Sequence, residues 1–292
     1  MRHALKIKPN HVTVLAAVLV ASATAPGAGR DGTAVTAPAM ISLQPHPFYY
    51  RPAGEFTHDG KPVNAPARLL RPAKVLTIMA HQVTGADYQR CVLDHACTAT
   101  SSGAEDRPAI KINWHDANAY AAWLSRRLGA TYRLPTDEEW AFAAGSRFRD
   151  DALPDGAIDL AQRWLQRYEV EADRDEVIDN EPHAIGSYGA NEYGVLDLAG
   201  NVWEWTNTCF VHQTLNATRP TSILNCGIRV VEGRHRAYMT DFIRDPSGGG
   251  CAVGKPPSNL GFRLVRENGL WDWLQSIIAP ELSVIRTEGD SS

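Results

Sequence analysis

The segment "NEYGVLDLAGNVWEWT", Asn191–Thr206, constrains the fold more than any other part of the chain. Two tryptophans flank a glutamate, a Gly-Asn turn precedes them, and Asp197 stands seven residues before Glu204. Turn residues beside large aromatic residues indicate an irregular loop that leads into a core. Three interpretations are open: catalytic machinery, a metal-binding loop, or core packing of Trp203 and Trp205, with Glu204 bonded to a backbone amide.

The N-terminal residues have the pattern of an export signal. Three basic residues precede a short apolar run at residues 12–20, and "ASA" at 21–23 is a cleavage site. The run is about half of the roughly 20 residues that a membrane-spanning helix needs. No pair of arginines precedes it and no cysteine stands at the cleavage site. We therefore expect a signal peptide over residues 1–23, export by the general secretion route, a linker over 24–40, and a periplasmic or secreted protein.

Export changes what is expected of the five cysteines. In an oxidising compartment, Cys91 and Cys97 are close enough in sequence to close a small loop, and Cys209 and Cys226 can close a longer one. The alternative is five buried thiols, which export disfavours. Cys251 is left over as either a buried or a reactive thiol.

Three short helices are expected before Gly145. The first follows Thr84 as N-cap, and the second covers "DANAYAAWLSRRLG", which ends at Gly129. The third follows a capping box of Thr136 and Glu139, and this capping accounts for the neighbouring acids without a metal. Beyond Gly145, Gly, Pro and Asn interrupt the chain, and we expect short strands joined by loops.

The C-terminal segment "LWDWLQSIIAPEL" begins at Leu270 and has the pattern of a short amphipathic helix. It carries acids and no basic residue, which disfavours a membrane surface. We expect this segment to pack back on the domain.

Three motifs in order, "YRLPTDEEWAFAAG", "YGVLDLAGNVWEWT" and "SNLGFRLVRE", resemble the formylglycine-generating enzyme family, also called sulfatase-modifying factor proteins. The likeness covers residues 41–267. It implies one α+β domain of the C-type-lectin-like fold, with few regular elements, short helices and short antiparallel strands. A helix and tail over residues 268–292 would follow this domain.

The resemblance also implies a structural calcium ion in the Asn191–Thr206 segment. Carried over to this sequence, the ligands are the side chains of Asp197 and Glu204 and the carbonyls of Gly200 and Val202. Calcium binds about six to eight oxygens of these kinds. The family's second calcium site has no convincing match here between residues 155 and 179.

The resemblance does not carry the family's oxidation chemistry over. Members that oxidise a substrate cysteine hold copper(I) with two cysteines, but residues 229–250 contain none, and Cys251 comes too late. Ergothioneine-type sulfoxide synthases hold iron with a His-x3-His-x-Glu motif, and none of the ten histidines has this spacing. Neither copper nor iron is supported by these routes.

A dense polar set stands at the family's active-site position. Its members are Arg234, His235, Arg236, Tyr238, Asp241 and Arg244. As a functional site it would be an anion-binding or acid/base pocket, with His235 as proton carrier. His235 and Met239 would also be two candidate ligands for copper(I). The alternative is a solvated strand and turn held by Arg–Asp pairs.

The amino-acid sequence of this loop resembles that of exported family members linked to copper nitrite reductases in denitrifying bacteria. Family members that complete the pyoverdine siderophore chromophore also lack the cysteine pair. The leading hypothesis is therefore an accessory or maturation factor for a periplasmic copper enzyme, without formylglycine-generating activity. The alternatives are a metal-dependent oxidase of a small molecule or peptide that acts through Arg234–Arg244, and a non-catalytic binding module. A net charge of −4 gives no basis for nucleic-acid binding. After signal cleavage we expect no membrane attachment.

Overall fold

The computed structural model describes residues 35–100, 104–154, 156, 159–174, 181–215, 221–246, 257–267 and 269. The expected signal peptide, most of the linker, Cys251 and the C-terminal segment from Leu270 lie outside the described residues. In the described part of the chain, no helix has both the length and the apolar character needed to cross a bilayer. The compact unit begins at Val35, and its first strand begins at Met40, one residue before the expected domain boundary.

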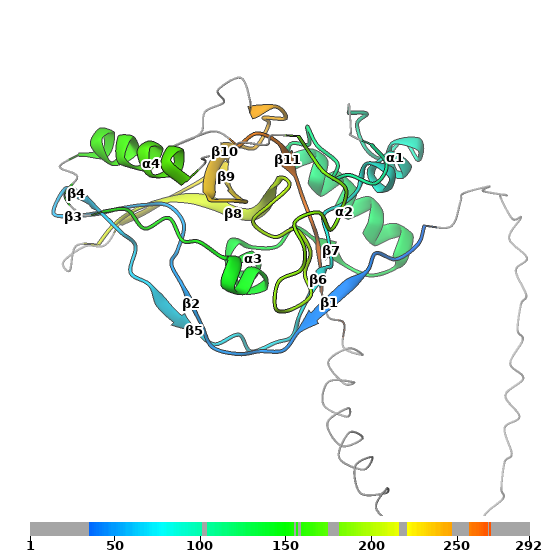
Figure 1. The fold of residues 1–292 in the computed structure, drawn as a ribbon, viewed down its shortest axis with the longest axis horizontal. Coiled ribbons are helices and arrows are strands. Elements are labelled where there is room, and N and C mark those ends of the chain that lie inside the picture. The colour runs from blue at the N-terminus through cyan, green and yellow to red at the C-terminus, as the bar shows by residue number, and fades with distance from the viewer. Residues whose placement is uncertain are drawn as a thin grey trace, which may run out of the picture. The chain divides into compact units, whose positions relative to one another are not determined.

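Two principal sheets organise the described residues (Figure 1). The four-stranded sheet has the order β1 (Met40–Leu43), β6 (Leu76–Met79), β12 (Val265–Arg266), β7 (Tyr132–Arg133), and all its pairs are antiparallel. The other has the order β10 (Arg236–Thr240), β9 (Thr221–Glu232), β8 (Trp203–Thr214), β3 (Glu55–His58), β4 (Lys61–Val63), with β11 (Leu260–Gly261) parallel to β8. A small ribbon pairs β2 (Phe48–Tyr50) with β5 (Arg68–Leu70). Most strands are short, which confirms the α+β expectation, although β8 and β9 are 12 residues each.

The three expected helices are confirmed with their caps. They are α1 (Gly85–Leu93), α2 (Trp114–Leu128) and α3 (Asp137–Ala144), and a 3₁₀ turn η1 (Gly145–Arg147) follows α3. The side chain of Thr84 caps α1, and Thr136 and Glu139 form the capping box of α3. Helix α2 begins two residues before the expected start because Asn113 forms a capping box with Asp116. It ends at Gly129, whose φ of 66° is a conformation that glycine adopts without strain.

The expectation that helices end at Gly145 was wrong. Helix α4 (Leu160–Arg174) has 15 residues and lies beside β3 and β4 in Figure 1. The buried residues of α4 include Arg163, Arg167 and Glu171, so its inward face is charged. Sequence periodicity identifies helices by an apolar face that packs against a core, and therefore does not identify a helix whose buried face is charged.

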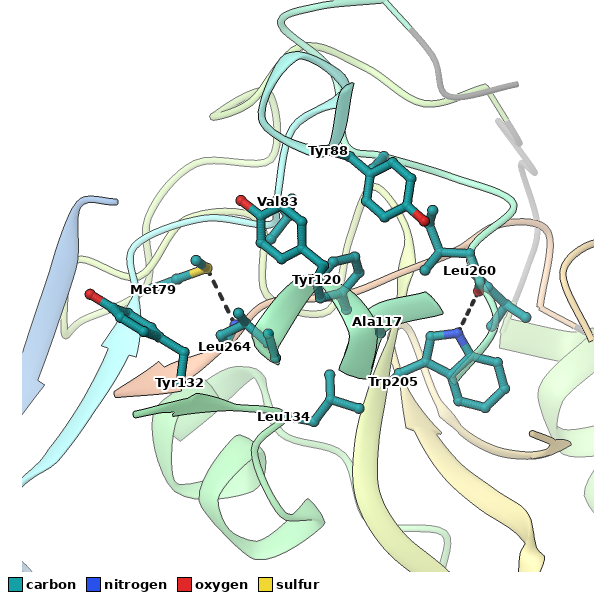
Figure 2. Close-up of a cluster of buried hydrophobic side chains, with 14 of the residues drawn as sticks. Met79, Val83, Tyr88, Ala117, Tyr120, Tyr132, Leu134, Trp205, Leu260 and Leu264 are labelled. Atoms are coloured by element: carbon teal, nitrogen blue, oxygen red, sulfur yellow. Dashed lines mark hydrogen bonds between the residues drawn. The ribbon is translucent and has the colours of Figure 1, made fainter. Parts of the chain in front are cut away.

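Aromatic and aliphatic side chains from α1, α2 and both sheets form the main core (Figure 2). Tyr88 and Tyr120 stack in its centre, with ring centroids 5.9 Å apart. Trp203 and Trp205 of the Asn191–Thr206 segment are 5% and 0% exposed, and the indole of Trp205 donates to the carbonyl of Ile112 at 2.6 Å. The burial of these tryptophans is therefore confirmed, whereas the donors to Glu204 among the described residues are side chains and not the expected backbone amide.

Both expected disulfides are present. Cys91 pairs with Cys97 at the end of α1, and Cys209 pairs with Cys226 across the β8–β9 hairpin. The second bond joins the strands where their register shifts, near Cys209.

Candidate functional site

The turn that leads to Glu204 is built from strained backbone. Asp197, Ala199 and Asn201 have φ values of 56°, 58° and 66°, in the left-handed region that non-glycine residues rarely adopt. The carboxylate of Asp197 accepts hydrogen bonds from the backbone N–H groups of Gly186, at 2.6 Å, and Tyr188, at 2.9 Å. These bonds tie the 186–188 turn to the segment and hold the strained residues in place.

Glu204 lies at the centre of a fully buried cluster. Arg263 donates to both of its carboxylate oxygens, from Nε at 2.5 Å and from a terminal nitrogen at 2.7 Å. The amide of Gln82 donates at 2.8 Å and the indole of Trp140 at 2.9 Å. Since a carboxylate offers about four lone-pair sites, these four N–H donors occupy all of them.

Both expected side-chain ligands for calcium already accept hydrogen bonds in this arrangement: Asp197 accepts from two backbone N–H groups, and Glu204 accepts from four side-chain donors. A cation beside Glu204 would compete with the guanidinium of Arg263, which already neutralises the carboxylate. Of the two expected carbonyl ligands, that of Gly200 already accepts from the N–H of Val202 at 2.8 Å. Calcium binding by Asp197, Gly200, Val202 and Glu204 stays a prediction.

The polar set Arg234–Arg244 divides between two places. Arg236 and Tyr238 lie on one face of β10, where they meet α3, α4 and the chain before β3. Asp241 and Arg244 lie beyond the strand and contact the start of α2, where Arg244 pairs with Asp116 at 2.7 Å and Asp241 lies 3.3 Å from His115. The alternation of a strand brings Arg236 and Tyr238 to one face and sends Ala237 and Met239 into the opposite core.

Arg236 is the centre of a buried ion-pair network. Its guanidinium contacts three carboxylates, those of Asp137 at 2.8 Å, Asp151 at 2.9 Å and Glu232 at 2.7 Å. Two tyrosine hydroxyls complete the arrangement: Tyr50 donates to Asp137 and Tyr238 donates to Asp151, each at 2.6 Å. We call these residues, together with Arg167, the Arg236 network.

Burial sets the protonation of the network. Burial and the neighbouring Asp137 raise the pKa of Glu232 well above its ordinary value, despite the opposing effect of Arg236. Burial alone would also raise the pKa of Asp151, but Arg236 and Arg167 outweigh it and lower that pKa. The two neighbouring acids therefore have pKa values shifted in opposite directions, upward for Glu232 and downward for Asp151. Two acids with divergent pKa values are a pattern that also occurs in catalytic sites.

Helix α4 covers this network with its charged face. Arg167 pairs with Asp151 at 3.1 Å, and its guanidinium lies 5.5 Å from the ring centroid of Tyr238. Glu171 lies 3.6 Å from Nδ1 of His235, which is 4% exposed. Arg163 donates to Asn64 and to the carbonyl of Pro154. The signal in the sequence was the spacing of these three charged residues, four apart along one helix face.

The covered site is nearly filled. The cavities against α4 have volumes of about 20 Å³, beside Arg163 and Asp151, and about 10 Å³, beside Glu171 and His235. Each holds at most about one water molecule. Within the described ranges, no three His, Cys, Asp or Glu side chains are grouped as metal ligands, and Met239 is buried in the main core. In the described state, the network is a closed polar core.

The outer face of α4 carries an apolar stripe, at whose edge the indole of Trp164 donates to Glu55 of β3. Trp164, Leu165 and Tyr168 are 45%, 57% and 51% exposed, and Ala161 and Ala172 extend the same stripe. The five positions follow the 3, 4, 7 spacing of an amphipathic helix. Because the charged stripe faces inward, this helix presents to the surface the face that ordinarily enters a core.

Sequence comparison shows the family of this chain. The family model "Sulfatase-modifying factor enzyme 1-like domain" matches residues 27–268. The chain is 30% identical over 171 residues to the inactive C-alpha-formylglycine-generating enzyme 2 of Bos taurus. This alignment covers 52% of this chain and 53% of that protein. It is 32% identical over 146 residues to the formylglycine-generating enzyme of Streptomyces coelicolor, covering 48% of this chain and 43% of that enzyme. The chain thus spans about half the length of these curated relatives.

Among solved structures, PvdO from Pseudomonas aeruginosa aligns with a TM-score of 0.50 and 20% sequence identity. The alignment covers 82% of this chain and all of PvdO. At this identity the likeness shows the shared fold.

Proposed function

Because this chain belongs to the sulfatase-modifying factor enzyme 1-like family, we propose that it is an exported accessory or maturation factor that binds a protein partner and does not generate formylglycine. The partner we propose is a periplasmic redox enzyme of the copper nitrite reductase type. The observation that carries the proposal is the outward apolar stripe of α4, at the position where the loop of the family's active site is covered.

The cysteine inventory supports the absence of formylglycine generation. Four of the five cysteines form the two disulfides, so Cys251 alone is left over. Two thiolates are needed to hold copper(I) in the family's manner, and Cys251 can supply at most one. Incubation with a cysteine-containing sulfatase peptide is expected to leave the peptide mass unchanged, and formation of the aldehyde would refute this part of the proposal.

The α4 stripe has the chemistry of a transient protein interface. Tryptophan and tyrosine at helical spacing, near polar residues such as Gln162 and Glu169, match a helix that docks in an apolar groove. The acids on this face disfavour an anionic membrane surface. The stripe is small compared with the roughly 800 Å² per partner of a standard interface, so we expect reversible binding.

Binding to the purified copper nitrite reductase of the same organism tests the proposal. We expect Tyr168→Glu and Leu165→Glu to weaken binding by about 2 kcal/mol or more, roughly 30-fold, while folding is kept. Tyr49→Glu is the matched control, because Tyr49 is 73% exposed on β2 and lies outside the stripe. Absence of binding by the parent protein, or equal loss in the control, would refute the partner assignment.

A metal-dependent oxidase acting through Arg234–Arg244 is the second candidate, and the opposite pKa shifts of the neighbouring acids Glu232 and Asp151 favour it. It requires α4 to move, since the two small cavities between α4 and the Arg236 network admit no substrate. Stoichiometric copper or iron in the purified protein, lost in His235→Ala, would support the oxidase. The accessory function predicts that Tyr168→Glu, not His235→Ala, removes the protein's effect on its partner. A non-catalytic binding module would bind the partner with the same affinity as an accessory factor but would leave the partner's activity unchanged.

A further inference from the structure

The two disulfides differ in what surrounds their sulfurs. Cys226 belongs to the exposed part of β9, and its partner Cys209 is half-buried on β8. The guanidinium of Arg229 donates a hydrogen bond to Sγ of Cys209 at 3.1 Å. In the other pair Cys91 is buried, and among the described residues no cationic side chain donates to the sulfur of Cys91 or Cys97. Only the first pair therefore joins an exposed cysteine to a sulfur that lies beside a cation.

Three contacts hold Arg229 next to this sulfur. The residue pairs with Cys209 in the β8–β9 ladder, its guanidinium lies 3.9 Å from the ring centroid of Trp114, and it donates to the carbonyl of Asn207 at 3.1 Å. Burial lowers the pKa of Arg229 and Asp241 raises it, but an arginine stays protonated in proteins. Within the described ranges its guanidinium forms no direct ion pair with a carboxylate, so its charge is available to the sulfur.

A cation beside one sulfur makes a disulfide easier to open by attack on the other. A neighbouring arginine lowers the pKa of a thiol, and in thiol–disulfide exchange the sulfur with the lower thiol pKa leaves faster. The rate also depends on which sulfur an incoming thiolate reaches. Both criteria give the same direction here, because Cys226 is the more exposed residue and Arg229 lies beside Cys209.

The hairpin keeps its strand pairing on both sides of this disulfide. Cys209–Arg229 and Phe210–Asn225 are successive pairs of the β8–β9 ladder, so Cys226 lies in a bulge between them. A residue in a bulge has no ladder partner on the opposite strand. Opening the sulfur–sulfur bond therefore leaves the backbone pairs on either side of the bulge in place, and the two cysteines stay close enough to form the disulfide again.

We propose that Cys209–Cys226 is a redox-active disulfide that exchanges two electrons with an external dithiol. One thiolate of the dithiol attacks Sγ of Cys226; the sulfur–sulfur bond breaks, and its electron pair leaves on Sγ of Cys209, beside Arg229. The second thiolate then attacks the dithiol's own sulfur in the mixed disulfide and releases Cys226 as a thiolate. The dithiol becomes a disulfide, and its two protons pass through solvent to the two cysteines. This site does not depend on the partner proposed for the α4 stripe.

Timed reduction of the full chain tests the exchange. The protein in a Cys251→Ser background is incubated with dithiothreitol, free thiols are alkylated at intervals, and peptide mass spectrometry follows each cysteine pair. We expect Cys209–Cys226 to open at least about tenfold faster than Cys91–Cys97, which is the internal control. Equal rates, or faster opening of Cys91–Cys97, would overturn the proposal.

Substitution of Arg229 separates the effect of the cation from simple exposure. We expect Arg229→Gln to slow the opening of Cys209–Cys226 by about threefold or more, because the pKa of the leaving thiol returns toward its ordinary value. Arg229→Lys keeps the charge and is expected to recover most of the rate. An unchanged rate of Cys91–Cys97 shows that the variants are folded. Equal or faster opening of Cys209–Cys226 in Arg229→Gln would overturn the proposal, since exposure alone would then set the rate.

A monothiol identifies the attacked sulfur without a change to Arg229. Glutathione in place of dithiothreitol stops at the mixed disulfide, which we expect on Cys226, with the alkylating reagent on Cys209. Glutathione found on Cys209 would overturn the proposed direction of attack. Thioredoxin distinguishes a protein dithiol from a small one: faster opening than by dithiothreitol at equal concentration supports a protein dithiol, and slower opening supports a small one. Opening by neither would overturn the site.

Discussion

Helices α2 and α4 have the same length, 15 residues, and opposite inward faces. The first buries Tyr120, Trp123 and Leu124 in the main core, whereas the second buries Arg163, Arg167 and Glu171 against the Arg236 network. Burial of α2 is favourable mainly through apolar area, at about 25 cal/mol per Å². Burial of α4 depends on ion pairs, each of which must offset the desolvation of its charges.

The difference teaches where this fold is tolerant and where it is specific. Apolar packing accepts substitutions of similar volume, because its attraction has no direction. A charged core requires each partner in place, since one unpaired buried charge costs several kcal/mol. The core around α2 is therefore expected to tolerate substitution, whereas the core around α4 is expected to depend on the identity of each charged residue.

The largest effect is expected from Arg236→Ala. The change leaves Asp137, Asp151 and Glu232 without their shared cation, and breaking a buried pair costs about 3–5 kcal/mol. Urea unfolding measures the loss. Arg244→Ala is the matched control, because its pair with Asp116 is 44% exposed on the arginine side and is worth at most about 1 kcal/mol. Equal losses in the two variants would show that the network is not a charged core.

The same substitution, leucine to alanine, can be made on both helices to compare the buried face of α2 with the exposed face of α4. Leu124 on α2 is 1% exposed and Leu165 on α4 is 57% exposed. We expect Leu124→Ala to lower the free energy of unfolding by about 2–5 kcal/mol and Leu165→Ala by at most about 0.5 kcal/mol. A large loss for Leu165→Ala would mean that the apolar stripe packs within the protein rather than facing solvent.

The same contrast explains what the sequence predicted. Helices α1, α2 and α3 follow local rules, since caps such as Thr84 and Thr136 and an apolar period are visible in the sequence. Helix α4 was not predicted from the sequence because its inward stripe is charged, and its apolar stripe at Trp164 and Leu165 meets no core. The disulfides were predictable from cysteine spacing and export, without any knowledge of the strands that carry them.

The site was only partly visible in the sequence. Arg236 and Tyr238 stood out in a dense polar loop, but their partners Tyr50, Asp137 and Asp151 are about 85 to 190 residues away in the chain. Such pairings depend on the sheet that brings β10 beside α3, which no local pattern encodes. For the same reason the sequence did not separate Asp241 and Arg244 from the rest of the loop.

Glu232→Gln tests the protonation of the charged core. The pKa of Glu232 is raised by burial and by Asp137, so at pH values between the ordinary and the raised pKa the folded protein keeps a proton that the unfolded chain releases. Its contribution to stability is therefore complete below the ordinary pKa of glutamate and is lost as the pH rises through the raised value, by about 1.4 kcal/mol per pH unit.

Glutamine keeps both hydrogen bonds of a neutral acid, so Glu232→Gln is expected to remove this decline. Urea unfolding between about pH 5 and about pH 8 measures the slope in both proteins. The lowered pKa of Asp151 acts in the opposite sense, because its contribution is lost as the pH falls, so the acid limb should be the same in both. A parallel pH dependence across the whole range would show that Glu232 is ionised in the folded protein.

Calcium chelation is expected to have the smallest effect, and it compares the Glu204 cluster with the Arg236 network. Both are buried carboxylate–arginine clusters, but the four N–H donors around Glu204 leave none of its lone-pair sites to a metal. We therefore expect a chelator to change the melting temperature by less than about 2 °C, which for a domain of this size is under about 1 kcal/mol. An increase of more than about 4 °C on adding calcium, lost in Asp197→Ala, would instead establish the site of Asp197, Gly200, Val202 and Glu204. It would also mean that Arg263 moves away from Glu204 when calcium binds, so that the two clusters differ in whether a metal or an arginine holds the acid.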